Sequence, residues 1–235
     1  MFRLSIRLRL LLVFMSLFTV ALATFSYWFY RFATDRAMDY LRQSLMTAAA
    51  TAAGMIDADE HAQVYAMGVE EGESYTHIAD QMRFVRDANP TVAAIYTMVR
   101  STHADELIFV VSADENPETR VHLGAPYDIS EMPEMLAAFD SPAADAEMGA
   151  DEYGVWLSGY APILDASGNG VAIVGVDMLA QDVTRVQTRV RNVSLLTFLA
   201  AEAAVFCAAL LLSTTVTRPL RSITGAASAL ERGEP

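Results

Sequence analysis

The sequence contains no lysine and only one cysteine, Cys207, among its 235 residues. A single cysteine cannot form an intrachain disulfide, so any exported part of the chain must be stabilised by its own core. The sequence also lacks a glycine-rich phosphate loop, a Cys-x-x-Cys pair and metal-ligand spacing among its four histidines. We therefore expect no catalytic residue, no metal and no cofactor, and we expect this chain not to be an enzyme.

Positive charge is scarce in the middle of the chain. Residues 31–192 contain 10 arginines against 26 aspartates and glutamates, which gives this segment a net charge of −16 in a chain whose total is −13. So acidic a segment repels phosphate groups, which excludes nucleic acid as a partner. It favours small-molecule ligands that are neutral, zwitterionic or cationic.

Apolar residues make up 53% of the sequence, a high share for a soluble domain of this size. The excess lies in two runs. Residues 10–30 carry no charge, and residues 193–216 carry only one, Glu202. Because each run is long enough to cross about 30 Å of hydrocarbon as a helix, we predict two transmembrane helices.

Arginines flank both runs, three before the first and two after the second. They are Arg3, Arg7, Arg9, Arg218 and Arg221. Because positively charged flanks are retained on the cytoplasmic side, we expect residues 1–9 to be a cytoplasmic tail and residues 31–192 to be an extracytoplasmic domain. The chain would then be a multi-pass protein of the inner, or cytoplasmic, cell membrane.

The first run also has the outline of a cleavable signal peptide, since arginines precede it and Ala21-Leu22-Ala23 resembles a cleavage site. The uncharged run is longer than a usual signal core, however, and it continues past that site into an aromatic belt that ends at Tyr30. A retained helix is therefore the favoured interpretation.

Helical patterns come first in the middle segment. Residues 31–66 hold no proline and suit a long helix that continues the first span. Its apolar residues recur at steps of three to five, which is typical of a helix packed on its own domain core or of a dimer seam. A second helix, with Tyr75, Ile78 and Met82 on one face, should end at the proline of Asn89-Pro90.

Strand patterns follow. Runs rich in β-branched and aromatic residues predict four strands, which we place at residues 92–100, 107–111, 155–164 and 171–178. The turn between the last two should make them an antiparallel hairpin. A short helix is expected within residues 128–140, followed by an acidic loop. This order predicts an α+β domain with an antiparallel sheet.

Two stretches resemble known families. Residues 159–177 (GYAPILDASGNGVAIVGVD) resemble the closing hairpin of Cache sensor domains, which are PAS-like extracytoplasmic modules of prokaryotic receptors. Residues 217–234 (TRPLRSITGAASALERGE) are similar to the first helix of a HAMP domain, and they begin where the second span ends. The resemblance implies a PAS-like antiparallel sheet with a long N-terminal helix, flanked by two transmembrane helices.

The resemblance also implies a function. Such a chain would be a homodimeric receptor input module that binds a small extracytoplasmic ligand and relays a conformational change through HAMP. HAMP domains have two helices per subunit, and residues 217–235 supply only the first, so this HAMP domain is expected to be truncated. The sequence does not indicate which kind of output domain the receptor would control. Two alternatives stay open: the sensory part of a receptor histidine kinase, cyclase or phosphatase, and a ligand-free structural or dimerisation sensor.

Strand alternation indicates where a ligand could bind. Tyr96 and Arg100 share one face of the first strand, and Trp156, Ser158 and Tyr160 share one face of the third. If those faces coincide, they form a pocket with aromatic walls and one guanidinium; otherwise the aromatic residues fill a core. Further candidates are Phe109, Tyr127, Asp114 and Asp177, the last of which could instead cap the helix that follows.

Two residues outside the sheet are candidates for signal relay. Glu202 lies near the middle of the second span, where a carboxyl group is costly in lipid, so we expect it to meet Ser16 or Thr19 of the first span. Pro219 lacks the amide of a continuing helix and should make a weak joint between the second span and the HAMP-like helix.

Overall fold

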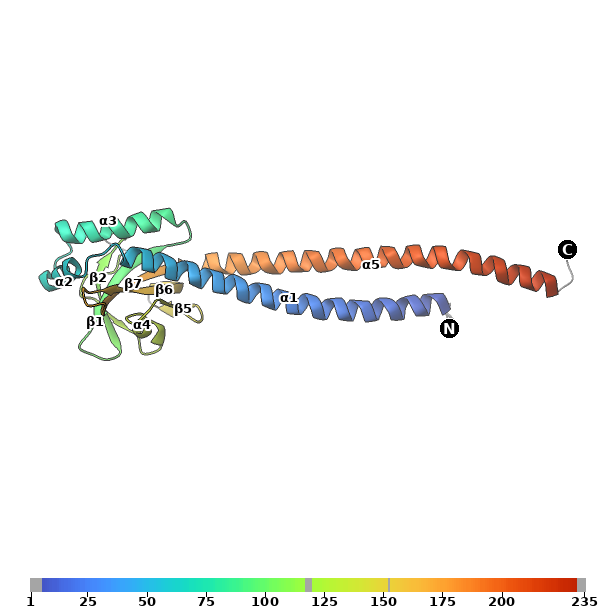
Figure 1. Cartoon of the computed structure of the whole chain (residues 1–235), viewed down its shortest axis with the longest axis horizontal. Coiled ribbons are helices and arrows are strands. Elements are labelled where there is room, and N and C mark those ends of the chain that lie inside the picture. The colour runs from blue at the N-terminus through green and yellow to red at the C-terminus, as the bar shows by residue number, and fades with distance from the viewer. Residues whose placement is uncertain (1–5, 117–119, 152, 232–235) are drawn as a thin grey trace. The chain divides into compact units, whose positions relative to one another are not determined.

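The computed structural model describes residues 6–116, 120–151 and 153–231 (Figure 1). The chain divides into two compact units. One contains residues 1–35 together with residues 188–235, and the other contains residues 36–187.

The first unit consists of two helical stretches. They belong to α1 (Ile6–Ala53) and α5 (Ala180–Glu231), both of which are long and apolar enough to cross a membrane by length and composition. Large apolar side chains such as Leu17 and Leu211 are exposed on them. Between the helices, Thr19 Oγ1 donates a hydrogen bond to Glu202 Oε2 over 3.2 Å, which is one of the two contacts that the sequence predicts for Glu202.

The joint expected at Pro219 is not a break in the backbone, because α5 continues as one helix from Ala180 to Glu231. Proline removes a single backbone hydrogen bond, and a helix can accommodate that loss and continue. A separate HAMP-like helix is therefore not distinguished from the second span in this structure, and the resemblance of residues 217–234 to HAMP stays a prediction.

The second unit begins with three helices. α1 ends at Ala53 rather than near Ala66, and α2 (Ala58–Met67) starts after a short break. The physical reason is Asp57, which caps α2 by accepting hydrogen bonds from the amides of the second and third residues after it. α3 (Glu73–Ala88) buries the apolar face that the sequence indicates and ends where expected.

The seven strands form one antiparallel sheet in the order β3-β2-β1-β7-β6-β4, with β5 also paired to β6. The four predicted strands are β1 (Ala94–Arg100), β2 (Glu106–Ser112), β6 (Gly154–Leu164) and β7 (Gly170–Leu179), and the last two form the predicted hairpin. The α+β class with an antiparallel sheet is thus confirmed.

The excursion between β2 and β6 contains more structure than predicted. The short helix α4 spans only Pro133–Ala137. Three short strands were not predicted: β3 (Pro126–Asp128), β4 (Ala143–Ala144) and β5 (Gly149–Asp151). At two or three residues each they are too short to show a period-two pattern, and the last two lie in what the sequence indicates as an acidic loop.

The sheet has an apolar cluster on each face. One cluster joins α1, α2 and α3 to inward residues of β1, β2, β6 and β7, and it includes Leu41, Leu45, Ala48 and Ala52 of α1. These residues therefore pack on their own domain core. The other cluster joins α4 and the excursion to the opposite face, with Met98, Phe109 and Tyr160 among its members.

One buried polar pair lies beneath the helices. His61 Nε2 is 2.8 Å from Thr97 Oγ1, which also accepts a hydrogen bond from the Val111 amide. Burial lowers the pKa of His61 from 6.5 to about 4, so the imidazole is neutral near pH 7. His61 is thus a buried core residue.

α1 approaches β6 closely because Gly159 has no side chain. A Cβ atom at Gly159 would lie 2.6 Å from Leu45 Cβ and 2.9 Å from the Met46 amide nitrogen, both closer than packed atoms can come. The glycine therefore sets the distance between the helix and the sheet.

We expect Gly159→Ala to lower the free energy of unfolding by about 2 to 3 kcal/mol, because the added methyl group meets helix backbone that cannot move aside easily. The matched control is Gly149→Ala, since the nearest atom to a Cβ there is Met132 Cε at 4.0 Å. The control should change stability by less than about 1 kcal/mol. Urea unfolding of the detergent-solubilised chain measures both, and equal effects would contradict this account of the packing.

Candidate ligand-binding cavity

A cavity of about 530 Å³ lies on the face of the sheet opposite α1, within the usual range for small-molecule sites. Strands β1, β2, β3, β6 and β7 supply part of its lining, and the connection from β2 to β3 supplies another part. The lining residues are Ala93, Ala94, Tyr96, Phe109, Ser112, Asp114, Arg120, Val121, His122, Tyr127, Tyr153, Trp156 and Asp177.

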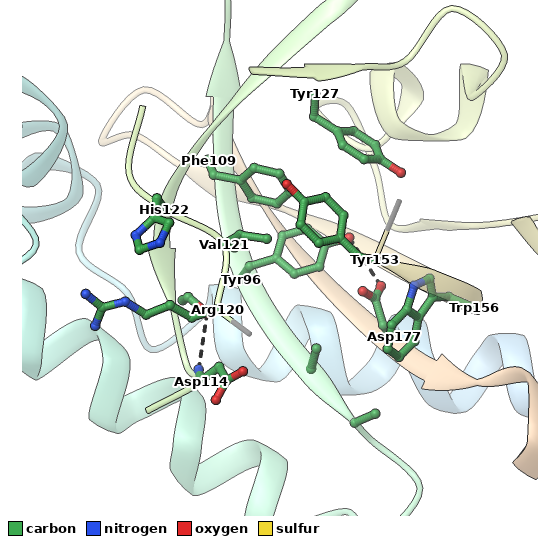
Figure 2. Close-up of a pocket in the computed structure, with 13 residues that line it drawn as sticks. Tyr96, Phe109, Asp114, Arg120, Val121, His122, Tyr127, Tyr153, Trp156 and Asp177 are labelled. Atoms are coloured by element: carbon green, nitrogen blue, oxygen red, sulfur yellow. Dashed lines mark hydrogen bonds between the residues drawn. The ribbon is translucent and has the colours of Figure 1, made fainter. Parts of the chain in front are cut away.

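Aromatic rings make up one side of the cavity (Figure 2). Phe109 is at the centre of this group, with ring centroids 5.2 Å from Tyr96, 5.6 Å from Tyr127 and 6.2 Å from Tyr153. All three contacts are edge-to-face, an arrangement that stabilises the rings beyond their burial alone. The wall is therefore preorganised, and Trp156 extends it along β6.

Tyr96 lies over Gly175 of the neighbouring strand β7. A Cβ atom at Gly175 would come within 2.4 Å of the tyrosine ring, so only glycine leaves room for it. The Tyr96 hydroxyl donates a hydrogen bond to Asp177 Oδ1 over 3.2 Å. Burial of the hydroxyl, together with the charge of Asp177, raises the pKa of Tyr96 well above 10, so the phenol stays protonated and remains a donor.

Asp177 is a buried carboxylate at the end of β7. It lines the cavity, and its backbone carbonyl accepts a hydrogen bond from the Ala93 amide over 2.8 Å. α5 begins three residues later, at Ala180. The side chain is thus placed where a ligand could meet it, and its contact with Tyr96 fixes its orientation.

The basic side chains of the lining, Arg120 and His122, contact Glu70. Arg120 Nη2 donates to Glu70 Oε2, and His122 Nδ1 lies 2.9 Å from Glu70 Oε1. Glu70 belongs to the loop between α2 and α3 and does not line the cavity. Among the described residues, the acidic side chains of the lining are Asp114 and Asp177, and these carboxylates stand nearer the cavity than Glu70 does.

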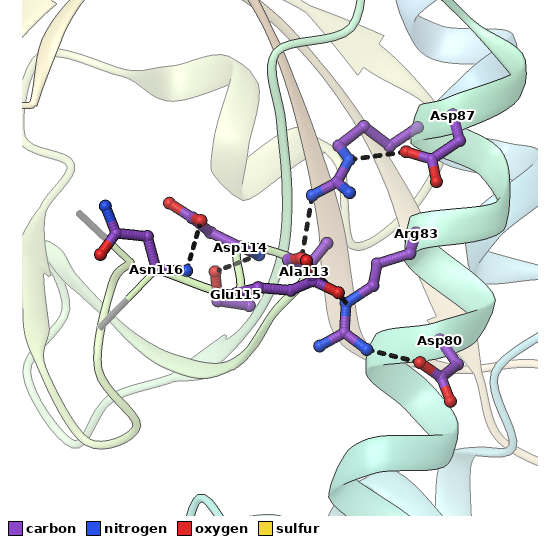
Figure 3. Close-up of polar contacts among 9 residues, drawn as sticks. Asp80, Arg83, Asp87, Ala113, Asp114, Glu115 and Asn116 are labelled. Atoms are coloured by element: carbon purple, nitrogen blue, oxygen red, sulfur yellow. Dashed lines mark hydrogen bonds and ion pairs between the residues drawn. The ribbon is translucent and has the colours of Figure 1, made fainter. Parts of the chain in front are cut away.

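Residues 113–116 and 120–125, the described parts of the connection from β2 to β3, are here called the wall segment, and they are also fixed at their start (Figure 3). The Ala113 carbonyl accepts hydrogen bonds from Arg83 Nε over 3.2 Å and from Arg86 Nη1 over 3.0 Å, both on α3. Arg83 also pairs with Glu115. Side chains of the helical layer therefore position the beginning of the segment that carries Asp114 into the cavity.

Five of the eight predicted ligand-binding residues line this cavity. They are Tyr96, Phe109, Tyr127, Trp156 and Asp177, and the weaker candidate Asp114 joins them. Whether any of these residues binds a ligand remains a prediction.

Arg100 does not line the cavity. It is exposed, and its guanidinium carbon lies 3.9 Å above the Phe139 ring. Four residues along a strand span about 13 Å, and the pairing of β1 with β2 shifts register between Tyr96 and Met98. Strand alternation gives the face of a residue but not how the neighbouring strands align with it, so the sequence groups Arg100 with Tyr96 although Arg100 is not among the lining residues. A ligand-binding role for Arg100 stays a prediction.

Ser158 and Tyr160 also lie outside the lining and surround a different carboxylate, Asp145. The Tyr160 hydroxyl donates to Asp145 Oδ1 over 3.0 Å, and the Ser158 amide donates to Asp145 Oδ2 over 2.9 Å. Arg42 of α1 donates to the backbone carbonyls of Asp145 and Ala146. Burial raises the pKa of Asp145 to about 6, although its hydrogen bonds with Ser158 and Tyr160 lower it.

The sequence gives little signal for the remaining lining residues. Arg120, Val121 and His122 lie in a connection with no periodicity, and Tyr153 precedes β6. The role of Glu70 depends on a contact between segments fifty residues apart, which no local pattern encodes.

No protein-family model matches this chain, and neither does a curated protein. Solved structures do. The sensor domain of E. coli DcuS is 17% identical, with 63% of this chain and 95% of that chain covered and a TM-score of 0.45. The V. cholerae histidine kinase DctB sensor domain is 8% identical, with 70% and 57% covered and a TM-score of 0.48.

The ligand-binding domain of the Campylobacter jejuni chemoreceptor Tlp3, in complex with 4-methylisoleucine, is 10% identical with a TM-score of 0.44. It covers 72% of this chain and 62% of its own. The chain thus spans less than two thirds of the Tlp3 and DctB domains.

The pKa of Asp145 predicts a pH dependence. Because the folded pKa of about 6 exceeds the ordinary aspartate pKa of 3.8, this group contributes stability below pH 4 that is lost as the pH rises through 6. Relative to Asp145→Asn, the wild-type chain should lose about 2 kcal/mol between pH 4 and pH 7, an amount reduced by the group's partial contact with solvent. Urea unfolding of both proteins at several pH values measures the difference, and a pH-independent difference would contradict the raised pKa.

Proposed function

We propose that this chain is the input module of a transmembrane receptor that binds a small ligand outside the membrane. The observation that carries the proposal is the cavity of about 530 Å³, lined by aromatic rings and two carboxylates. It lies in a domain whose chain continues into two helices long and apolar enough to cross a membrane.

The side chains around the cavity favour ligand binding over a ligand-free structural sensor. Tyr153 is 40% exposed, and Trp156 and Tyr127 are half-buried, so these rings do not close into a solid core. Aromatic side chains left partly exposed beside convergent polar groups are typical of a small-molecule site. With Asp114 and Asp177 in the lining, we propose a neutral, zwitterionic or cationic ligand.

The chain offers a short route from the cavity to the second apolar helix. Asp177 and Gly175 of β7 contact Tyr96, and α5 follows β7 without a linker. A ligand that favours one arrangement of β7 would thereby bias α5. We propose that this change passes through Glu202 and Pro219 to a HAMP-like helix in a homodimer, and that a kinase, cyclase, phosphatase or chemotaxis domain reads it.

Ligand binding can be tested with a thermal-shift screen of the detergent-solubilised chain against amino acids, amines and other small metabolites. A ligand present at about 100 times its Kd should add about 2.7 kcal/mol and raise Tm by about 5 °C or more.

The variant Asp177→Asn should then weaken binding of the hit about tenfold or more, because it removes a cavity charge. Asp59→Asn, at an exposed acid of α2, should leave binding unchanged. Equal affinities in the two variants would place the ligand outside this cavity.

Topology is tested with two reporters. The first reporter is active only in the cytoplasm and is fused after Pro235. The second is active only outside the membrane and is inserted at Gly72. We expect both to be active. Both results are expected because arginines flank the apolar runs on the same side. The reverse pattern would exclude an extracytoplasmic cavity.

A further inference from the structure

Glu70 is a carboxylate outside the cavity that binds one part of its lining at three points. Oε1 accepts hydrogen bonds from the Leu123 amide over 2.8 Å and from His122 Nδ1 over 2.9 Å, while Oε2 accepts from Arg120. Its side chain is 19% exposed, although it belongs to a short loop between two helices. So many contacts from one loop residue indicate a specific role at the wall segment.

The contacts with Glu70 change the charge that a ligand meets. Figure 2 shows the Arg120 guanidinium turned away from the Tyr96 and Phe109 rings. Arg120 and His122 are the basic residues of the cavity lining, and both are bonded to Glu70. Among the described residues of the lining, the formal negative charge then belongs to Asp114 and Asp177.

Glu70 remains ionised over the pH range in which a receptor would work. Burial raises the pKa of Glu70. The hydrogen bonds from Leu123 and His122 and the attraction of Arg120 lower this pKa by more than burial raises it, so the net change is downward. The pairing with Arg120 therefore persists near neutral pH.

We propose that Glu70 determines the charge selectivity of the cavity, by holding Arg120 and His122 against the helical layer so that the cavity admits organic cations in preference to anions. The proposal rests on the proposed function, because it takes this cavity as the ligand site. An ammonium group would meet aromatic faces and carboxylates, both of which attract cations. A carboxylate would find its natural partner, Arg120, already neutralised, and breaking that pair is costly.

Charged quenchers of tryptophan fluorescence test this selectivity without a known ligand. The sequence has two tryptophans, Trp28 and Trp156, so a Trp28→Phe background leaves the cavity tryptophan as the only emitter. The full chain is held in non-ionic detergent at a constant ionic strength of about 0.1 M, which keeps interactions within about 10 Å observable. Quenching by caesium, iodide and neutral acrylamide is compared.

In this background we expect caesium to quench Trp156 better, relative to iodide, than it quenches free tryptophan. Glu70→Gln should shift the caesium-to-iodide ratio toward iodide by about two- to fivefold, because it leaves the charge of Arg120 uncompensated in the cavity that Trp156 also lines. Acrylamide quenching should stay the same. Glu71→Gln is the matched control: it removes the same charge from an exposed neighbour that makes no contact with the wall segment, and it should leave the ratio unchanged.

A second variant keeps the test decisive if Glu70→Gln loosens the wall segment and raises acrylamide quenching. Because the proposal is that Glu70 neutralises Arg120, the double variant Glu70→Gln with Arg120→Gln should return the ratio to the wild-type value. An unchanged ratio in Glu70→Gln, an equal shift in Glu71→Gln, or no return in the double variant would overturn the proposal. A failed ligand screen would instead count against the proposed function, because the quenching ratio requires no bound ligand.

Discussion

The pairing of β7 with both β1 and β6 is the constraint on which the rest of the α+β fold depends. Most residues of β7 are buried. One of its faces packs against the helical layer, and the other contributes Ile173 to the opposite apolar cluster and Asp177 to the cavity lining. Gly175 leaves room for the Tyr96 ring, and Asp177 fixes that ring through its hydroxyl. A movement of Tyr96 therefore changes its contacts with β7, the strand that leads into α5.

The wall segment depends on the helical layer in a different way. Its ends pack against the core through Ala113 and Leu123. Charged side chains hold them as well, Arg83 and Arg86 at the Ala113 carbonyl and Glu70 at the Leu123 amide. Hydrogen bonds that involve a charged group are stronger than neutral ones, though they lose strength where solvent reaches them. The cavity thus combines an aromatic wall with the wall segment, whose position depends partly on a few contacts with charged side chains.

The sequence predicts the parts of this arrangement that have a period. Strand alternation gives the sheet, the hairpin and the inward direction of Tyr96 and Trp156, because hydrophobic periodicity is set by burial on each face. It does not give the register along a strand, so Arg100 and Tyr160 were assigned to the cavity when they contact Phe139 and Asp145 instead. Contacts between loops leave no periodic pattern in the sequence. The contacts of the wall segment with Glu70 could therefore not be predicted.

The polar contact between the two apolar helices has an energy comparable to what a ligand can supply. The hydrogen bond between Thr19 and Glu202 joins α1 to α5, and Glu202 Oε1 is buried with no hydrogen-bond partner among the described residues. Interhelical hydrogen bonds in apolar surroundings contribute about 0.5 to 2 kcal/mol, and coupling energies between sites are typically about 1 to 3 kcal/mol. A shift of α5 could replace this contact with one in which both carboxyl oxygens of Glu202 have hydrogen-bond partners. The resulting change in free energy between the two helix arrangements would be one that ligand binding can match. Under the proposed function, Glu202 would then set how much binding energy the relay requires, rather than conduct the signal itself.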